Sequence, residues 1–288
     1  MSQTDPRAAD PSVRNESTIW TPSEARGEAA GRARLHGRRI LVVGAGAQRL
    51  SEEDAPEGNG RAISLLCARE GALVGAVDKV EAAARETQRR IESEGHRALA
   101  YTANVTDPAA VTELVRAAAR DLGGLDGVVV NVGSGFGRGL SGTDLDAWDQ
   151  TFSLNLRAHF LVAQAAMPLL EAGSAFVFIG SVAGLRPGSG IPAYDASKAG
   201  LLGLSRHVAF EGSRRGVRSN VVLPGLIDTP LGRLASRGRP SRASTPVPLG
   251  RQGTAWEVAY ATAFLLSGEA SYITGQSLVV DGGLSNLR

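Results

Sequence analysis

The sequence has one cysteine, two lysines and no long apolar run, and each scarcity excludes a class of protein. The single thiol, Cys67, cannot form a disulfide within the chain. No apolar stretch approaches the roughly 18 residues of a membrane-spanning helix, and the N-terminus lacks the apolar core of a signal peptide. The four histidines lack the spacing of metal ligands (His36, His96, His159 and His207). We therefore expect a soluble cytoplasmic protein with no membrane partner and no metal site.

The charge balance gives no sign of a polyanionic partner. The formal net charge is +2, although the pI is about 9.0, and all but Lys79 and Lys198 of the 31 cationic residues are arginine. The arginines are interleaved with acidic residues, and no basic stripe contains the stacking aromatic residues of a nucleic-acid interface. Nucleic acid is therefore not an expected partner.

The composition changes near residue 38. Residues 1–37 contain five acids, five arginines and no strand-like run, which predicts a flexible N-terminal tail; covering a neighbouring subunit is the alternative. Strand-like and helix-like segments then alternate to residue 283, so residues 38–288 are predicted to form one α/β domain. Residues 128–130 are continuously apolar, which is typical of a strand covered on both faces and hence of a parallel sheet.

The first strand of this domain runs into a glycine turn. Its sequence, RRILVVGAGAQ, can direct backbone N–H groups of the turn toward a phosphate. Gly58 and Gly60, on either side of Asn59, open the next predicted helix. Isolated glycine pairs are weak signals in a chain with 36 glycines, and Arg49 breaks a strict G-x-G-x-x-G pattern.

Asp78 and Asn155 are polar residues at positions where a functional role is the simplest explanation for a polar side chain. Asp78 ends the next strand about 20 residues beyond Gly58, where a dinucleotide fold has the carboxylate that binds the ribose hydroxyls. An N-cap of the following helix is the alternative role for Asp78. Asn155 lies within an apolar helical stretch, where asparagine is unfavourable. It either bends the helix through a water molecule or faces solvent.

The stretch SVAGLRPGSGIPAYDASK, residues 181–198, combines residues suited to proton transfer. Ser181 follows the buried strand FVFIG, and Tyr194 and Lys198 are i and i+4 on one face of a predicted helix. A tyrosine pKa is about 10, and an ammonium ~4 Å away can lower it by roughly three units. With four tyrosines and two lysines in the chain, chance seldom produces this spacing. We interpret the stretch as catalytic rather than as a core aromatic beside a surface charge.

Together these residues resemble the short-chain dehydrogenase/reductase family, single-domain type, over residues 38–283. The resemblance implies a doubly wound, Rossmann-like parallel sheet of about seven strands in a three-layer α/β/α fold, with a nicotinamide dinucleotide on its carboxyl edge. The motif residues that carry it are Gly44, Gly58, Gly60, Asn131, Val132, Gly133, Asn155, Ser181, Tyr194, Lys198, Pro224, Gly225, Thr229, Asp281, Gly282 and Gly283.

The resemblance also implies residue roles. Tyr194 would be the general acid/base, Ser181 would bind the substrate oxygen, Lys198 would hold the ribose and lower the tyrosine pKa, and Asn155 would anchor a relay water. Members commonly form dimers or tetramers, so a homotetramer or homodimer is expected. The implied cofactor contacts are Gly44, Gly58, Asn59, Gly60, Asp78, Asn104, Val105, Asn131, Gly133, Tyr194, Lys198, Pro224, Gly225, Ile227 and Thr229.

The sequence departs from the family pattern in three places. Thirteen residues separate Gly44 from Gly58, where the pattern has three, so residues 47–57 contain an insertion in the cofactor turn. Val130 stands where the fourth-strand motif usually has its first asparagine, and Asn104 stands where an aspartate is usual near the adenine.

We expect an NAD-preferring oxidoreductase that interconverts a secondary alcohol and a ketone. One alternative is a 3-oxoacyl thioester reductase, for which the arginine-rich residues 231–250 would dock an acyl carrier. Another is a dinucleotide-binding protein without catalytic activity, which the complete Ser/Tyr/Lys group disfavours. The expected walls of the substrate pocket are residues 133–140 and 185–192, Leu226 and residues 231–250.

Overall fold

A seven-stranded parallel sheet forms the centre of the protein. The computed structural model describes residues 20–47, 55–237, 242 and 244–287. Every neighbouring pair in the sheet is parallel, and the strand order is β3-β2-β1-β4-β5-β6-β9. The doubly wound topology expected from the sequence is thus confirmed. The strands are β1 (Arg39–Val43), β2 (Leu73–Asp78), β3 (Ala98–Thr102), β4 (Leu125–Val130), β5 (Leu170–Ile179), β6 (Arg218–Pro224) and β9 (Ser277–Val280).

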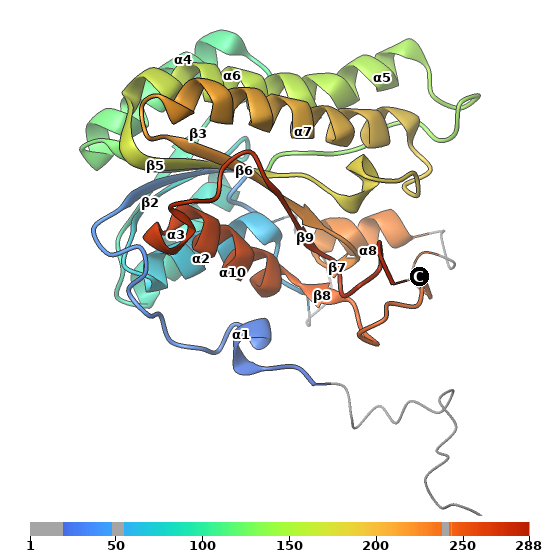
Figure 1. Ribbon diagram of the computed structural model, residues 1–288, viewed down its shortest axis with the longest axis horizontal. Coiled ribbons are helices and arrows are strands. Elements are labelled where there is room, and N and C mark those ends of the chain that lie inside the picture. The colour runs from blue at the N-terminus through green and yellow to red at the C-terminus, as the bar shows by residue number, and fades with distance from the viewer. Residues whose placement is uncertain (1–19, 48–54, 238–241, 243, 288) are drawn as a thin grey trace, which may run out of the picture.

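Helices cover both faces of the sheet and complete the three layers (Figure 1). One face is covered by α2 (Asn59–Arg69), α3 (Glu81–Ser93) and α10 (Ala255–Leu266). The other is covered by α4 (Pro108–Leu122), α6 (Ala158–Ala166) and α7 (Pro192–Ser213), with α5 (Leu145–Phe152) beside α7. In the described part of the chain, we find no helix with the length and apolarity needed to cross a bilayer.

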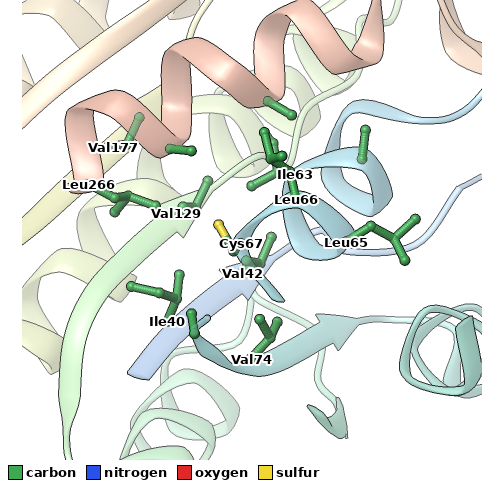
Figure 2. Packing of buried hydrophobic residues seen from close by; sticks show 14 of the residues in the cluster. Ile40, Val42, Ile63, Leu65, Leu66, Cys67, Val74, Val129, Val177 and Leu266 are labelled. Atoms are coloured by element: carbon green, nitrogen blue, oxygen red, sulfur yellow. The ribbon is translucent and has the colours of Figure 1, made fainter. Parts of the chain in front are cut away.

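The alternation of side chains along β1 divides the core into two clusters. Ile40 and Val42 face the layer of α2 and α10, whereas Leu41 and Val43 face the layer of α4 and α6. Figure 2 shows the first cluster, in which Cys67 of α2 points toward the sheet. Cys67 is fully buried in the core, and burial raises the pKa of its thiol to about 12.

The stretch predicted as one helix around Asn155 is instead a series of short elements. A π-helical segment, Ser153–Arg157, joins α5 to α6, and a 3₁₀ turn follows at Met167–Leu169. Strand β5 then begins at Leu170, six residues before the predicted strand. Hydrophobic period does not separate an α-helix from a π-helical turn, so the sequence pattern could not show this irregularity.

Residues 20–37 differ from the flexible tail predicted for residues 1–37. They include a one-turn helix, α1 (Ser23–Arg26), and their Ala25 and Leu35 side chains are fully buried against the domain. Residues 1–19 lie outside the described residues, as do residues 48–54 of the insertion. Two short strands, β7 (Ile227–Asp228) and β8 (Gly253–Thr254), pair beside α8 (Pro230–Ser236).

Candidate active site

The predicted site residues converge on the carboxyl edge of the sheet. Strands β1, β4, β5 and β6 are parallel neighbours, so their last residues lie along one edge. Gly44, Asn131, Ser181 and Gly225 each follow one of these strands within two residues. Residues far apart in the sequence are therefore brought together, as the parallel topology requires.

Ser181 and Tyr194 are placed by the starts of two helical elements. Ser181 is the N-cap of the 3₁₀ turn Val182–Gly184, and its Oγ accepts a hydrogen bond from the Ala183 N–H at 3.1 Å. Helix α7 begins with Pro192, whose fixed φ suits the first helical position. Tyr194 thus lies in the first turn of α7, and Lys198 lies one turn later on the same face.

Lys198 is buried and points toward the end of β5. Its Nζ donates a hydrogen bond to the Ile179 carbonyl at 3.0 Å and lies 5.7 Å from the centroid of the Tyr194 ring. Burial lowers the pKa of Lys198 to about 8, because an ammonium away from water loses its solvation. A buried ammonium at the edge of the sheet is typical of a functional site.

The pKa of Tyr194 is raised, contrary to the shift expected from the sequence. Burial is the largest cause, while a hydrogen bond with Ser181 and the charge of Arg242 act in the opposite direction. The Asp195 carboxylate adds to the increase. Lys198 does not offset burial, because with a pKa of about 8 it has already lost its charge at the higher pH where the tyrosine titrates.

The amide of Asn155 joins three segments of the site. Its Oδ1 accepts from the Ser134 N–H at 2.9 Å, and its Nδ2 donates to the Ser134 carbonyl at 2.8 Å and to Ser197 Oγ at 3.0 Å. The first two bonds hold the loop after β4, and the third holds α7 between Tyr194 and Lys198. Asn155 is fully buried, so the interpretation that it faces solvent is wrong.

The glycine turn after β1 is a cradle that side chains would fill. A Cβ on Gly60 would lie 1.8 Å from the Gly44 carbonyl oxygen, and Gly44 itself has φ +85°. Asn131 fastens the turn to β4, since its Nδ2 donates to the same Gly44 oxygen at 2.9 Å. Gly133 is less constrained, because its Cβ would lie 3.1 Å from the Lys198 Nζ, at the end of a side chain.

The N-terminus of α2 faces this cradle. Its N-cap, Gly58, provides no side-chain cap, so the first N–H groups of the helix have no partner within it. Such N–H groups and the positive end of the helix dipole suit a phosphate. Asn59 and Gly60 open the helix as predicted. The residues present therefore fit the pyrophosphate of a dinucleotide.

The cradle is also tied to α3. Thr87 Oγ1 donates to the Ala45 carbonyl at 2.9 Å, and Glu57 at the end of the insertion forms an ion pair with Arg90. These contacts place Glu57 toward α3. The middle of the insertion, residues 48–54, lies outside the described residues.

Asp78 ends β2 with both carboxylate oxygens engaged by backbone. Its Oδ2 accepts from the Gly46 N–H at 3.1 Å, and its Oδ1 accepts from the Val80 N–H at 3.0 Å. Each oxygen has a second lone pair with which to accept from a ribose hydroxyl. At the neighbouring strand end, Asn104 Oδ1 accepts from Thr106 Oγ1 at 2.9 Å, and Val105 is buried.

The loop after β6 forms the other end of the candidate cofactor site. Pro224 ends the strand, and the Gly225 N–H donates to the Val280 carbonyl at 2.9 Å. Ile227 then pairs with β8, and Thr229 caps α8, with its Oγ1 accepting from the Gly232 N–H at 3.0 Å. The backbone of Ile227 is therefore held at the edge of the sheet.

Two glycine-rich loops line the side facing the Tyr194 ring. The Gly139 N–H donates to the Gly190 carbonyl at 2.9 Å, so the two predicted pocket walls contact each other. A Cβ on Gly135 would lie 2.9 Å from Ile191 Cδ1 and 3.3 Å from the Tyr194 ring. These glycines allow the loops to approach the tyrosine closely.

Several residues of the site belong to no recognisable sequence motif, so the sequence alone could not identify them. Ser134 and Ser197 bind Asn155, and Thr87 binds the glycine turn. Arg242 belongs to the arginine-rich segment, but only the fold brings its charge near Tyr194. Its Nη1 donates to the Gly232 carbonyl at 3.0 Å, which holds it against α8. Arg239 of the same segment lies outside the described residues.

Comparison with known proteins finds relatives over most of the chain. A protein-family model described as enoyl-(acyl carrier protein) reductase matches residues 55–285. The curated 2-(S)-hydroxypropyl-CoM dehydrogenase 3 of Xanthobacter autotrophicus is 36% identical over 264 residues, covering 88% of this chain and 98% of that protein. The 3-oxoacyl-(acyl-carrier-protein) reductase of Thermotoga maritima is 34% identical over 253 residues, covering 87% and 99%. A solved dehydrogenase/reductase from Sinorhizobium meliloti is 30% identical with a TM-score of 0.76, covering 91% and 98%.

Replacing Lys198 by methionine should stabilise the protein at pH 7. The lysine pKa falls from 10.5 to about 8 on folding, which corresponds to a cost of about 3 kcal/mol while the unfolded chain is protonated. This cost decreases as the pH rises from about 8 to 10.5, because the folded state then binds fewer protons than the unfolded state. Urea unfolding of parent and Lys198→Met at several pH values should show the variant's advantage shrinking over that range. An advantage independent of pH would contradict the lowered pKa.

Proposed function

The chain belongs to the short-chain dehydrogenase/reductase family, and from this premise we propose that it interconverts a secondary alcohol and a ketone with NAD(H). The observation that supports this most directly is the convergence of Ser181, Tyr194 and Lys198 beside a glycine cradle that fits a pyrophosphate. A binding protein without catalytic activity has no need of this group. The complete set therefore favours an enzyme.

Each residue of the group has a chemical role that its position allows. Bound nicotinamide dinucleotide supplies the hydride for the carbonyl carbon, or accepts it from the alcohol. Tyr194 gives its phenolic proton to the substrate oxygen in reduction and takes it back in oxidation. Ser181 donates a hydrogen bond to the same oxygen, and Lys198 stabilises the phenolate once its ammonium turns from the Ile179 carbonyl. Asn155 keeps α7 and the loop after β4 in register for these steps.

The raised pKa of Tyr194 is compatible with this role in reduction. A protonated phenol is the form that donates a proton, and burial keeps it protonated at neutral pH. Oxidation needs the phenolate, so it should be favoured at alkaline pH.

Two carboxylates support a preference for NAD(H) over NADP(H). Asp78 would accept the ribose hydroxyls, whereas a 2′-phosphate would meet its negative charge. Glu57 stands directly before Gly58, where a cation would favour the phosphate, and it is paired with Arg90. The one cation next to Asp78 in the sequence is Lys79, which reduces the preference for NAD(H) over NADP(H) without reversing it.

A thioester substrate is the second candidate, because one relative is named a 3-oxoacyl-(acyl-carrier-protein) reductase. The charge of Arg242 near Tyr194 is compatible with an anionic carrier group. If a 3-oxoacyl-CoA had a higher kcat/KM than the matching methyl ketone, this alternative would be favoured over a simple ketone.

Changing Tyr194 to phenylalanine should reduce turnover by about 10²–10⁴ because the proton donor is lost while the ring is kept. Binding of NADH, followed by its fluorescence, should be unchanged. Nicotinamide absorbance with a panel of alcohols and ketones measures the activity, and Tyr272→Phe, at a fully exposed tyrosine, is the matched control. Turnover within tenfold of the parent would rule out the assigned role.

The parent should prefer NAD(H) over NADP(H) in kcat/KM by at least about tenfold, or about 1.4 kcal/mol. Asp78→Asn should narrow this preference because it removes the charge but keeps an oxygen to accept from Gly46 or Val80. Asp78→Ala, which also releases the turn, should lose NAD affinity as well. Equal use of both cofactors by the parent would refute the role given to Asp78.

A homodimer or homotetramer would bury an apolar groove between α5, α6 and α7. The groove, of about 770 Å³, is lined by Phe152, Leu156, Phe160 and Leu204 among other residues, and Phe160 is 44% exposed. An exposed apolar patch of this kind often marks an interface. Its flanking helices come from the layer that carries Tyr194.

Sedimentation at micromolar concentration should therefore give two or four times the 29.9 kDa of the chain. Phe160→Glu places a charge in the groove and should shift the mass toward the monomer. Val80→Glu, at an exposed residue before α3 on the opposite face, should not. A parent that sediments as a monomer at every concentration would contradict the expected assembly.

A further inference from the structure

Residues 20–35 form a segment that lies along α2 and the start of α10 (Figure 1). Ala25 and Leu35 are its fully buried side chains. Between them, the segment bonds to Arg69 and Glu70, the residues at the end of α2. We call residues 20–35 the N-terminal strap. It is ordered although its composition resembles that of a disordered tail.

Arg69 fastens the middle of the strap. Its Nη1 donates to the Gly27 carbonyl at 2.7 Å, and its guanidinium lies 4.8 Å from the centroid of the Trp256 ring. Its Nε and Nη2 donate to the two carboxylate oxygens of Glu94 at 2.6 and 2.7 Å. One planar cation therefore joins the strap to α2, α3 and α10, in a geometry that lysine could not reproduce.

Glu70 fastens the end of the strap. Its side chain is fully buried, and its Oε2 accepts from the N–H groups of Arg32 and Arg34, both at 3.0 Å. Its Oε1 pairs with the Arg34 guanidinium at 2.6 Å. Together these partners hold the pKa of Glu70 below its usual value although burial opposes them. A buried carboxylate with this many donors fixes the path of the strap.

The strap also has backbone positions that only glycine can occupy. Gly27 has φ +74°, and a Cβ there would lie 2.1 Å from Trp256 Cε2. A Cβ on Gly31 would lie 1.8 Å from the Arg69 carbonyl oxygen. The strap can therefore pack this closely against α2 and α10 only with glycine at these two positions.

Hydrogen bonds continue from the strap to the candidate cofactor site. Thr254 Oγ1 donates to the Ala25 carbonyl at 2.7 Å while it caps α10 through the Glu257 N–H. Thr254 also belongs to β8, which pairs with Ile227 and Asp228 of β7. The Gly253 N–H adds a bond to the Leu226 carbonyl at 2.9 Å.

We propose that the N-terminal strap is a positioning segment, which holds Thr254 and Trp256 and through β8 fixes β7 at the nicotinamide end of the cofactor site. Two strands of two residues each are too short to hold a fixed position by their own pairing. The first turn of α10 supplies the missing support, and the strap covers that turn. The inference rests on the proposed function, and on the family resemblance for the expectation that the Ile227 backbone and Thr229 hold the nicotinamide carboxamide.

Gly27 and Gly37 have nearly the same backbone φ, so substitutions at these two positions allow a controlled test. Gly27 and Gly37 have φ +74° and +73°, so alanine has the same backbone cost at each. Only at Gly27 does the new Cβ meet Trp256, since no atom lies within 4 Å of a Cβ on Gly37. Gly27→Ala should displace the strap, and Gly37→Ala should not.

Hydrogen exchange of the unliganded protein is the first readout. Peptides covering residues 226–229 and 251–254 should exchange at least about fivefold faster in Gly27→Ala than in Gly37→Ala. Should Gly27→Ala fail to fold, Arg69→Met replaces it, with Arg85→Met at an exposed arginine of α3 as its control. Unchanged exchange at β7 and β8 in a variant whose strap exchanges faster would overturn the proposal.

Ligand binding is the second readout. Gly27→Ala should raise the Kd of NADH at least about fivefold while leaving the Kd of ADP-ribose, which lacks the nicotinamide, within about twofold. An equal loss of affinity for NADH and for ADP-ribose would indicate general destabilisation and overturn the positioning role. A parent that binds NADH, with variants that bind it equally well, would overturn this inference alone. A parent that binds no nicotinamide cofactor would overturn the proposed function together with it.

Discussion

The amide of Asn155 is the contact on which the arrangement of the candidate site depends. Its three hydrogen bonds join the loop after β4 to the first turns of α7. An amide can do this because it offers both a donor and an acceptor, so it satisfies both polar groups of the Ser134 backbone at once. The π-helical turn directs the side chain inward. Loss of this clamp would remove the side-chain hydrogen bonds that hold the Lys198 turn against the loop that carries Gly133.

The electrostatics of the site follow from placing ionisable groups away from water. Lys198 loses solvation and gains a single carbonyl partner, so its pKa falls, whereas the burial of Tyr194 raises the tyrosine pKa. The lysine pKa therefore moves toward neutral pH, whereas the tyrosine pKa moves further above it. This state stores free energy that a bound ligand can release by offering the ammonium better partners.

The parts of the molecule that could be predicted from the sequence are those encoded by local pattern. Apolar runs identified the strands, and the i, i+4 spacing identified the Tyr194 and Lys198 pair. The π-helical turn was missed because hydrophobic period alone does not distinguish it from an α-helix. The strap was missed for another reason: its order comes from Arg69 and Glu70, which are distant in sequence, and composition carries no information about such partners. The direction of the Tyr194 shift likewise depends on burial, which only the fold reveals.

The two layers of helices contribute different things to the site. The layer of α2, α3 and α10 braces the candidate cofactor site at both ends, through Thr87 and Glu57 at the glycine turn and through the strap at β7. The layer of α6 and α7 supplies Tyr194 and Lys198, and its exposed groove faces away from the sheet. The sheet, whose central strands are fully buried, lies between the two layers. Changes to the strap should therefore alter how the cofactor is held without altering the contacts between Tyr194 and Ser181, because those contacts lie within a single layer and its loops.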